Sequence, residues 1–312
     1  MLWMADRLVG RAGGGGRGAL HSIDMNAGVP FSGPGSSNAA PAAGMEDIVQ
    51  LDQNHPGFRD SEYRARRNHI AQQALRWRPG DPTPDVEYTD VEQGVWRTVW
   101  LNLSPLHGQH ASTEYKACSE RVTFSHHRIP QLREVNQKLA GTTGYTMVPV
   151  AGLVTSRAFL GNLRFDQFLS TQYIRHHTVP LYTPEPDIVH ELVGHAATLA
   201  DPGFAALNRA FGRAAERVSE DVLKQIERVY WYTLEFGVTK ENGKLKAYGA
   251  GLLSSFGELE RFQREARLVP LDIAQMIARP YDPTVYQEVL YVARSFPEAV
   301  RTVTSWLDEV AR

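Results

Sequence analysis

Apolar side chains recur every three or four residues over a long stretch in the second half of the chain. This period is typical of an amphipathic helix that packs one face against a core. Asp201 and Pro202 precede the stretch and favour a helix start, because an acidic N-cap followed by proline satisfies or removes free N–H groups. Gly212 is a candidate interruption. The recurring positions are Phe204, Leu207, Phe211, Ala214, Val218, Val222, Ile226 and Val229.

Start and stop signals predict two further helix boundaries. Thr183, which is followed by proline, favours a helix that runs from about Pro186 to His195, with Gly194 near its end. Further along, the helix that carries Glu235 is predicted to end at Gly237, since glycine is common just beyond a helix C-terminus.

Strand-like alternation of apolar and polar residues is scarce in this chain. Two short segments qualify, Thr146–Val150 and Lys244–Tyr248. The sequence has no internal repeat and no second low-complexity linker. We therefore predict one compact domain whose fold class is mainly α with minor β.

The first 45 residues differ in composition from the rest. Residues 1–45 are rich in glycine, alanine, serine and proline, as in GRAGGGGRGA and GPGSSNAAPAAG. Such a segment buries too little apolar surface to offset the entropy lost on ordering. We predict that it is disordered, with Met25 and Met45 as alternative translation starts, and that residues 46–312 form the folded domain.

Composition and charge narrow the functional classes. Hydrophobic residues make up 42% of the chain and charged residues 22%, and the formal net charge is −2. This balance predicts no nucleic-acid partner, and no apolar run reaches the roughly 20 residues that span a membrane.

Cys118 is the single cysteine, which excludes an intrachain disulfide and a thiolate zinc site. No apolar leader follows the first arginines, so we expect a cytoplasmic protein.

His190 and His195 are candidate metal ligands. Zinc proteases place two histidines four residues apart, so that both rings lie on one helix face. These two are five apart and would point about 140° away from each other on an ideal helix. They converge on one ion only if the helix ends or distorts near His195, which Gly194 allows. Two separate structural histidines are the alternative interpretation.

A third ligand would be a carboxylate, because two imidazoles and one carboxylate on one face of an ion are typical of non-haem iron sites. Glu235 lies in the apolar segment YWYTLEFG, where a carboxylate is costly unless it is paired or bound to metal. An ion pair with an arginine explains it equally well. The full set of candidates is Asp187, Glu191, Asp201, Glu235 and Glu258.

Several long segments resemble a known family. VPVAGLVTSRAFLGNLRF, TQYIRHHTVPLYTPEPDIVHELVGH, VYWYTLEFGV and KAYGAGLLSSFGELE are similar to the catalytic core of the pterin-dependent aromatic amino acid hydroxylases, and to their phenylalanine hydroxylase branch in particular. The similarity runs from about His55, in HPGF, to about Phe296. It implies that residues 46–312 are an iron- and pterin-binding catalytic domain of that family's fold.

The resemblance implies a role for each matching residue. His190, His195 and Glu235 match the ligands of Fe(II). Arg175 matches the residue that grips the substrate carboxylate, and Asp187 matches its partner. Thr183 and Ser254 match residues that make further polar contacts around the substrate and the first histidine.

The same resemblance implies a site for tetrahydrobiopterin or a related tetrahydropterin. Phe159 matches the aromatic ring that stacks on the pterin, while Val154 and Ser156 match contacts to the same ring system. Glu191 matches the acid beside the pterin and the iron-bound water. Tyr230 matches a tyrosine near the iron. The resemblance implies a catalytic role for three residues, which are Glu191, Tyr230 and Trp231.

Substrate choice follows from a few positions. Trp231 matches the tryptophan of phenylalanine and tyrosine hydroxylases, where tryptophan hydroxylases carry a smaller phenylalanine. Pro283 stands where tyrosine hydroxylases carry an acid. Val189, and Ala197 followed by Thr198, depart from the family pattern beside the ligands and could reshape the substrate pocket, which keeps attack at the meta position as an alternative. We therefore expect para-hydroxylation of L-phenylalanine, with meta-hydroxylation, tyrosine or tryptophan hydroxylation, and more remotely a zinc hydrolase as alternatives.

The expected partners are an aromatic amino acid, O₂ and a pterin, with neither nucleic acid nor membrane. The sequence ends with SWLDEVAR, and the resemblance to the animal enzymes extends neither to their regulatory domain nor to their C-terminal tetramerisation helix. We predict a monomer. A non-catalytic binding protein on the same fold is the remaining alternative.

The histidine pairs His107 with His110 and His126 with His127 lack a carboxylate in similar context and are interpreted as structural.

Overall fold

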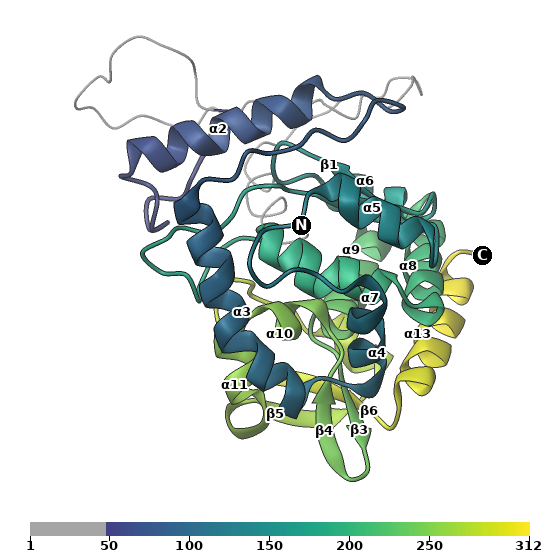
Figure 1. Ribbon diagram of the computed structural model, residues 1–312. Helices are drawn as coiled ribbons and strands as arrows, with labels where there is room; N and C mark the ends of the chain where they lie inside the picture. Colours follow the sequence, from purple (N-terminus) through teal and green to yellow (C-terminus); the bar gives the residue numbers. More distant parts are fainter. Residues whose placement is uncertain (1–47) are drawn as a thin grey trace.

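The computed structural model describes residues 48–312, and the segment predicted to be disordered lies outside them. Helices dominate, as predicted (Figure 1). The α-helices are Ser61–Arg76 (α2), Asp90–His110 (α3), Thr113–Val122 (α4), Leu132–Ala140 (α5), Ser156–Leu163 (α6), Ala197–Leu199 (α7), Pro202–Ala215 (α8), Glu220–Tyr230 (α9), Ala250–Ser254 (α10), Phe256–Glu265 (α11), Ile273–Ala278 (α12) and Phe296–Val310 (α13). Two π-helices, His190–Ala196 (η1) and Trp231–Glu235 (η2), interrupt this pattern.

Two small sheets accompany the helices. Strands Thr146–Pro149 (β1) and Gln167–Ser170 (β2) pair in parallel across α6. A four-stranded sheet has the order β4-β3-β6-β5, in which β3 and β4 form a hairpin and the other pairs are parallel. Its strands are Val238–Glu241 (β3), Lys244–Ala247 (β4), Arg267–Pro270 (β5) and Val289–Ala293 (β6).

The two predicted strands are confirmed as β1 and β4. The other four strands were not predicted, because each has only four or five residues and none shows a clear alternation. Strand β6 is buried at four of its five positions, so its sequence, VLYVA, carries no polar face.

The long amphipathic stretch forms two helices rather than one. Asp201 caps α8 as predicted, with its carboxylate accepting from the N–H groups of Gly203 and Phe204. The break falls at residues 216–219, where Ser219 caps α9. Gly212 does not interrupt the pattern but lies inside α8.

Gly212 is required by close packing between helices. A Cβ atom there would lie 2.3 Å from the backbone nitrogen of Arg164, at the C-terminal end of α6. Helices α6 and α8 pack directly on each other. A glycine lets the two backbones approach, and this positions α6 beside the centre of the molecule.

The predicted helix Pro186–His195 has different boundaries in the structure. It begins at Ile188, becomes the π-helix η1 at His190 and continues without a break through α7 to Leu199. Gly194 is therefore inside the helix instead of ending it. Its missing side chain lets η1 contact α10, since a Cβ would lie 2.9 Å from the Cβ of Ala250.

The helix that carries Glu235 ends at that residue, close to the predicted position, but the stated reason was wrong. Gly237 does not adopt the positive φ of a glycine cap. A Cβ there would lie 2.1 Å from Cζ of Tyr248 and 2.3 Å from the carbonyl oxygen of Thr233. Glycine is needed because the chain turns tightly against the Tyr248 ring before entering β3.

The elements enclose η1 and η2 between α2 at one end of the molecule and the four-stranded sheet at the other (Figure 1). All residues of η1 and η2 are buried. Within residues 48–312, no helix is both long and apolar enough to cross a bilayer.

Replacing Gly212 by alanine tests the close approach of α6 and α8. Alanine favours a helix interior by about 1 kcal/mol over glycine, but overpacking against a backbone typically costs about 1–3 kcal/mol. Gly161→Ala in α6 is the matched control, since an added Cβ there meets nothing within 4 Å. In denaturant unfolding we expect Gly212→Ala to be less stable than Gly161→Ala. Equal stabilisation of both variants would show that α6 and α8 are not in tight contact.

Candidate metal centre and the adjoining cavity

Three buried side chains converge at the centre of the molecule. Nε2 of His190 and Nε2 of His195 lie 2.9 Å apart. Glu235 brings one carboxylate oxygen to 3.1 Å from Nε2 of His195 and the other to 3.5 Å from Nε2 of His190. The sequence prediction that these three residues share one site is confirmed as geometry.

The π-helix explains how histidines five residues apart meet. Its hydrogen bonds join residues five apart, so these residues lie on one face of the helix, as residues four apart do in an α-helix. The N–H of Ala197 donates to the carbonyl of Leu192, which is such a bond. The second π-helix carries Glu235 and shows the same spacing, from the N–H of Phe236 to the carbonyl of Trp231 at 2.9 Å.

The separations fit a metal ion bound on one face. Imidazole and carboxylate ligands bind first-row metals at roughly 2.0–2.2 Å, so two ligands at right angles lie roughly 3 Å apart and two at tetrahedral angles roughly 3.4 Å. Two of the three observed separations, 2.9 and 3.1 Å, match the right-angle value. Such a face leaves the opposite half of an ion's coordination sphere for other ligands.

The protonation pattern also fits a cation. Ser254 Oγ donates its one proton to the carbonyl of Ala250 at 2.7 Å, so it must accept from Nδ1–H of His190 at 2.9 Å. Nε2 of His190 therefore carries a lone pair directed at the centre. Oε2 of Glu235 is buried and has no hydrogen-bond partner among residues 48–312. A divalent cation would satisfy both atoms.

Burial and the interactions among these side chains favour a neutral His190 and an ionised Glu235. Burial lowers the pKa of His190 well below 6.5, which keeps the ring neutral. Burial raises the pKa of Glu235, but the adjacent His195 and His190 outweigh this effect and lower it to about 2. Neutral imidazoles and an ionised carboxylate are the forms that bind metal.

A cavity of about 310 Å³ adjoins the metal centre and includes His190 in its wall. Apolar side chains make up much of the lining, which suits an aromatic ligand, and Arg175 is its one arginine. The residues are Arg175, Leu181, Tyr182, Thr183, Glu185, Pro186, His190, Phe236, Gly251, Ser254, Ser255, Glu258, Pro283, Thr284, Val285 and Tyr286.

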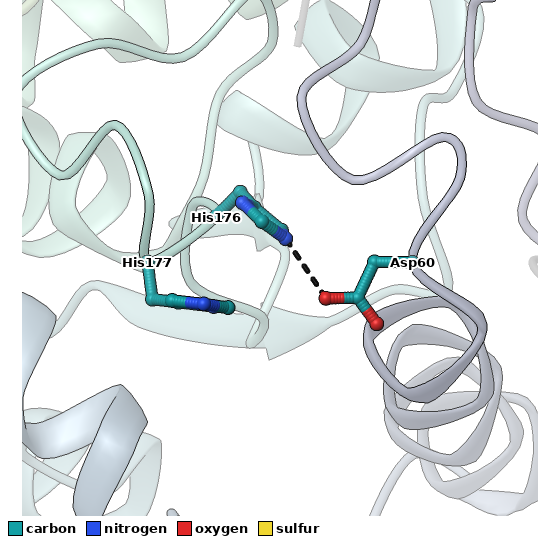
Figure 2. A group of neighbouring side chains, drawn as sticks. All are labelled: Asp60, His176 and His177. Atoms are coloured by element: carbon teal, nitrogen blue, oxygen red, sulfur yellow. Dashed lines mark hydrogen bonds and ion pairs between the residues drawn. The ribbon is translucent and has the colours of Figure 1, made fainter.

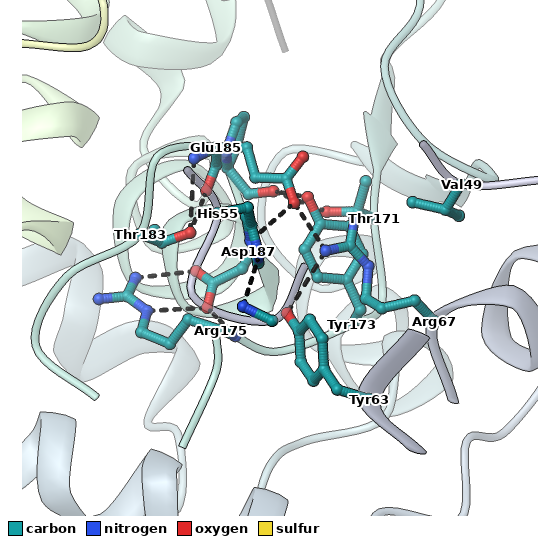
Figure 3. A network of polar contacts seen from close by, with 12 residues as sticks. Val49, His55, Tyr63, Arg67, Thr171, Tyr173, Arg175, Thr183, Glu185 and Asp187 are labelled. Carbon is teal, nitrogen blue, oxygen red and sulfur yellow. Dashed lines mark hydrogen bonds and ion pairs between the residues drawn. The ribbon is translucent and has the colours of Figure 1, made fainter. Parts of the chain in front are cut away.

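Arg175 is fixed by a buried carboxylate. Nε and Nη2 donate to the two oxygens of Asp187, each at 2.8 Å, and the Arg175 backbone N–H donates to the same group at 2.8 Å (Figure 3). Asp187 also accepts from the N–H of His190 at 3.3 Å. Three of the five guanidinium N–H groups remain for another acceptor, such as a ligand carboxylate.

The other predicted substrate contacts divide into two groups. Thr183 and Ser254 line the cavity. Trp231 does not line it: the ring is fully buried, stacks on Tyr281 at 4.3 Å and lies behind Phe236 at 4.6 Å. Its influence on cavity shape is therefore transmitted through Phe236, which the sequence did not single out.

Of the predicted pterin contacts, Phe159 is linked to the metal centre through Phe168, and Glu191 follows His190 directly in η1. Phe159 contacts Phe168 edge-on at 5.2 Å, and Phe168 packs on the ring of His195 at 4.5 Å. Glu191 accepts from the hydroxyl of Thr171 at 3.1 Å, and burial raises its pKa to about 7. Its Oε2 has no hydrogen-bond partner within the described part of the chain.

The remaining predicted residues surround Phe159. Ser156 is buried at the first position of α6, and Val154 is half-buried just before it. Tyr230 is fully buried, contacts Phe159 edge-on at 5.7 Å and shares a hydrogen bond of 3.3 Å with Asn208. Phe159 itself is fully covered by protein.

A second group of possible metal ligands lies elsewhere, at Asp60, His176 and His177 (Figure 2). Both ring nitrogens of His176 already have partners: Nε2 contacts Asp60 at 3.1 Å and Nδ1 contacts Thr178 at 2.8 Å. His177 is exposed. This group therefore fixes the start of α2 against the chain near Arg175 and does not resemble the buried triad.

A buried ion pair supports the cavity from behind and was missed at the sequence level. Nη1 of Arg67, from α2, contacts Glu185 at 2.6 Å, and its guanidinium lies 3.2 Å from the centre of the Tyr173 ring (Figure 3). His55 Nδ1 accepts from the N–H of Gly57, so its Nε2–H faces Glu185 at 3.4 Å. His55 lies in the motif HPGF, where the resemblance begins, and Arg67 lies in the segment YRARR that follows it.

Comparison with known proteins agrees with this geometry. The family profile described as biopterin-dependent aromatic amino acid hydroxylase matches residues 44–312. A tyrosine 3-monooxygenase of Drosophila melanogaster is 43% identical over 267 residues, which are 84% of this chain and 46% of that protein. A phenylalanine-4-hydroxylase of Caenorhabditis elegans is 43% identical over 269 residues, which are 85% of this chain and 59% of that protein. The chain thus spans about half the length of these curated relatives.

A solved structure of similar fold contains both cofactors. The phenylalanine hydroxylase of Chromobacterium violaceum, with bound iron(III) and oxidised 7,8-dihydrobiopterin, superposes with a TM-score of 0.68 at 26% identity. The match covers 76% of this chain and 90% of that one. The expected fold class, mainly α with minor β, is confirmed. Together with the profile match over nearly all described residues, these similarities show that the chain belongs to the biopterin-dependent aromatic amino acid hydroxylase family.

Proposed function

We propose that the protein is a monooxygenase that hydroxylates the ring of L-phenylalanine at the para position, with Fe(II), a tetrahydropterin and O₂. The observation that carries the proposal is the buried triad of His190, His195 and Glu235 beside a cavity that contains Arg175. When bound, iron and tetrahydropterin supply the reducing and O₂-activating chemistry that protein side chains lack.

The residues of this chain bind and orient. His190, His195 and Glu235 hold the metal on one face, and the hydrogen bond from His190 to Ser254 fixes the tautomer of that ligand. Arg175 takes the substrate carboxylate, so that the ring extends along the apolar wall toward the triad. Glu191 holds or releases a proton beside the pterin near neutral pH, because burial raises its pKa to about 7.

Phenylalanine is favoured over tyrosine by the loop that closes the cavity. Pro283 lines the cavity where tyrosine hydroxylases carry an acid. The neighbouring Asp282 turns back into its own loop, where it accepts from the N–H of Thr284 at 2.9 Å and from its hydroxyl. Neither residue offers a charge to a substrate phenol. Trp231 behind Phe236 leaves less space than the phenylalanine of tryptophan hydroxylases.

The departures from the family pattern do not reach the cavity wall, so they give no reason to prefer meta attack. Val189 and Ala197 are buried, and neither belongs to the cavity wall. Thr198 turns its hydroxyl to the carbonyls of His195 and Gly194 at 2.9 and 3.1 Å. These three residues pack behind the metal ligands, so they do not alter the surface that holds the ring.

Two further properties are part of the proposal. We propose a cytoplasmic protein, because a single cysteine suits a reducing compartment, whose partners are the amino acid, O₂ and the pterin. The zinc hydrolase alternative is disfavoured because the family profile that matches residues 44–312 is that of the biopterin-dependent aromatic amino acid hydroxylases.

The direct test is a product assay. The protein is incubated with Fe(II), tetrahydrobiopterin, O₂ and each aromatic amino acid in turn, and the products are separated by chromatography. We expect para-tyrosine from phenylalanine as the main product, with slower turnover of tyrosine and tryptophan. Meta-tyrosine as the main product would overturn the ring position, and no pterin-dependent O₂ uptake with any substrate would overturn the activity.

Removing a ligand of the triad is expected to abolish iron retention. Glu235→Gln keeps the shape and removes the charge, whereas His190→Ala removes one nitrogen ligand. Iron per protein, measured by plasma mass spectrometry after gel filtration, should fall from near one to near zero while circular dichroism stays unchanged. His177→Ala is the control, because His177 is exposed and belongs to the other histidine group. Iron content that follows His177 instead would move the metal site there.

Changing Arg175 should affect the amino acid selectively. Arg175→Lys keeps a positive charge for Asp187 but loses the planar fork that binds a carboxylate at two points. We expect the KM for phenylalanine to rise roughly 10- to 100-fold, as for loss of a charged hydrogen bond, with the KM for pterin changed less than about threefold. Arg217→Lys, on an exposed residue, is the control. Equal changes in both KM values would remove Arg175 from the substrate role.

A further inference from the structure

A buried carboxylate that the proposed chemistry does not use faces the same cavity as Arg175. Glu258 lies in the first turn of α11 and is 6% exposed. It lines the cavity together with Ser254 and Ser255, and these three residues form one wall that begins at the hydrogen-bond partner of the ligand His190. Its position is therefore fixed relative to the metal centre.

Within residues 48–312, no cationic side chain forms an ion pair with Glu258, although the charge of nearby Arg261 lowers its pKa. Its Oε1 accepts from the backbone N–H of Gln287 at 2.9 Å, and within residues 48–312 it forms no ion pair. Arg261 is one turn further along α11, but its Nε donates to the carbonyl of Gly257 at 2.7 Å and its Nη1 lies 3.6 Å from Glu265. Burial raises the pKa of Glu258 to about 7.

The other charged groups of the cavity wall are already balanced. Arg175 is paired with Asp187, and Glu185 is paired with Arg67 at 2.6 Å. Glu258 is thus a buried carboxyl group whose ionised form has no paired cation among residues 48–312, and burial disfavours that form until a cation approaches. A buried carboxylate of this kind is costly unless a cation joins it. The described residues supply none, so the missing cation belongs to the ligand.

We propose that Glu258 binds the α-ammonium group of the substrate while Arg175 binds its carboxylate. The inference rests on the proposed function, because it assigns a second recognition point in the same amino acid cavity. A zwitterion would balance both charges on entry, so the site would select intact α-amino acids over acids or amines with the same ring. Glu258 would then be a specificity-determining residue, with the aromatic ring left to the apolar wall.

The test compares three ligands that share one ring: L-phenylalanine, 3-phenylpropanoate, which lacks the ammonium, and phenethylamine, which lacks the carboxylate. Dissociation constants are measured by calorimetry on the iron-loaded protein without O₂. Glu258→Gln removes the charge but keeps an oxygen that can accept from the Gln287 N–H. Glu260→Gln is the matched control, since Glu260 is exposed on the same helix.

Glu258→Gln is expected to weaken binding of L-phenylalanine and phenethylamine roughly 10- to 100-fold and to leave 3-phenylpropanoate unchanged or tighter. Arg175→Lys should show the opposite selectivity, with weaker binding of L-phenylalanine and 3-phenylpropanoate only. Glu260→Gln should match the unmodified protein with all three ligands. In turnover, Glu258→Gln should raise the KM for phenylalanine more than it lowers kcat.

Equal weakening of all three ligands in Glu258→Gln would assign the residue a structural role and overturn the inference, as would no change for any of them. The same comparison with tyrosine and tryptophan and their des-amino analogues separates this inference from the choice of ring. Ammonium selectivity with one of those amino acids supports Glu258 even if phenylalanine is not the substrate. If none of the three amino acids binds, the proposed function fails, and this inference fails with it.

Discussion

The structure depends on a buried carboxylate, that of Glu235. One of its two oxygens has no hydrogen-bond partner among residues 48–312. Glu235 is 1% exposed, and its nearest polar neighbours are the two imidazoles of the triad. Such a group costs several kcal/mol unless a cation compensates it. A divalent metal ion would compensate this charge more fully than the imidazoles do, and metal binding is expected to stabilise the fold as well as to prepare the site.

The two π-helices are the backbone solution to that constraint. A regular α-helix would direct His190 and His195 to different sides, while the wider turn of η1 brings both to one side. Turns of this kind are rare because they pack less well, so one is retained where it places a functional group. Here both ligand-bearing segments contain one, and close contacts at Gly194 with Ala250 and at Gly237 with Tyr248 hold them in position.

The three residues that the structure gathers at its centre were all candidates from the sequence, whereas several surrounding elements were not predicted. Residue type and resemblance identified His190, His195, Glu235 and Arg175, because metal and carboxylate binding tolerate few alternatives. The periodic rules failed where tertiary contact decided: Gly212 and Gly237 were interpreted as breaks or caps, but each makes room for another segment. The short strand β6 was invisible because it is buried on both faces and shows no alternation.

Long-range pairing is the part of the site that a linear pattern cannot reveal. Arg67 and Glu185 are 118 residues apart in the chain and meet in a buried ion pair behind the cavity. Removing one member of such a pair typically costs about 3–5 kcal/mol, because the other is left buried and unpaired. Glu185 is two residues from Asp187, which holds Arg175, so the pair connects the first described helix to the arginine of the cavity wall. The cavity is thus a property of the whole domain, since its recognition groups are held by a segment more than 100 residues away.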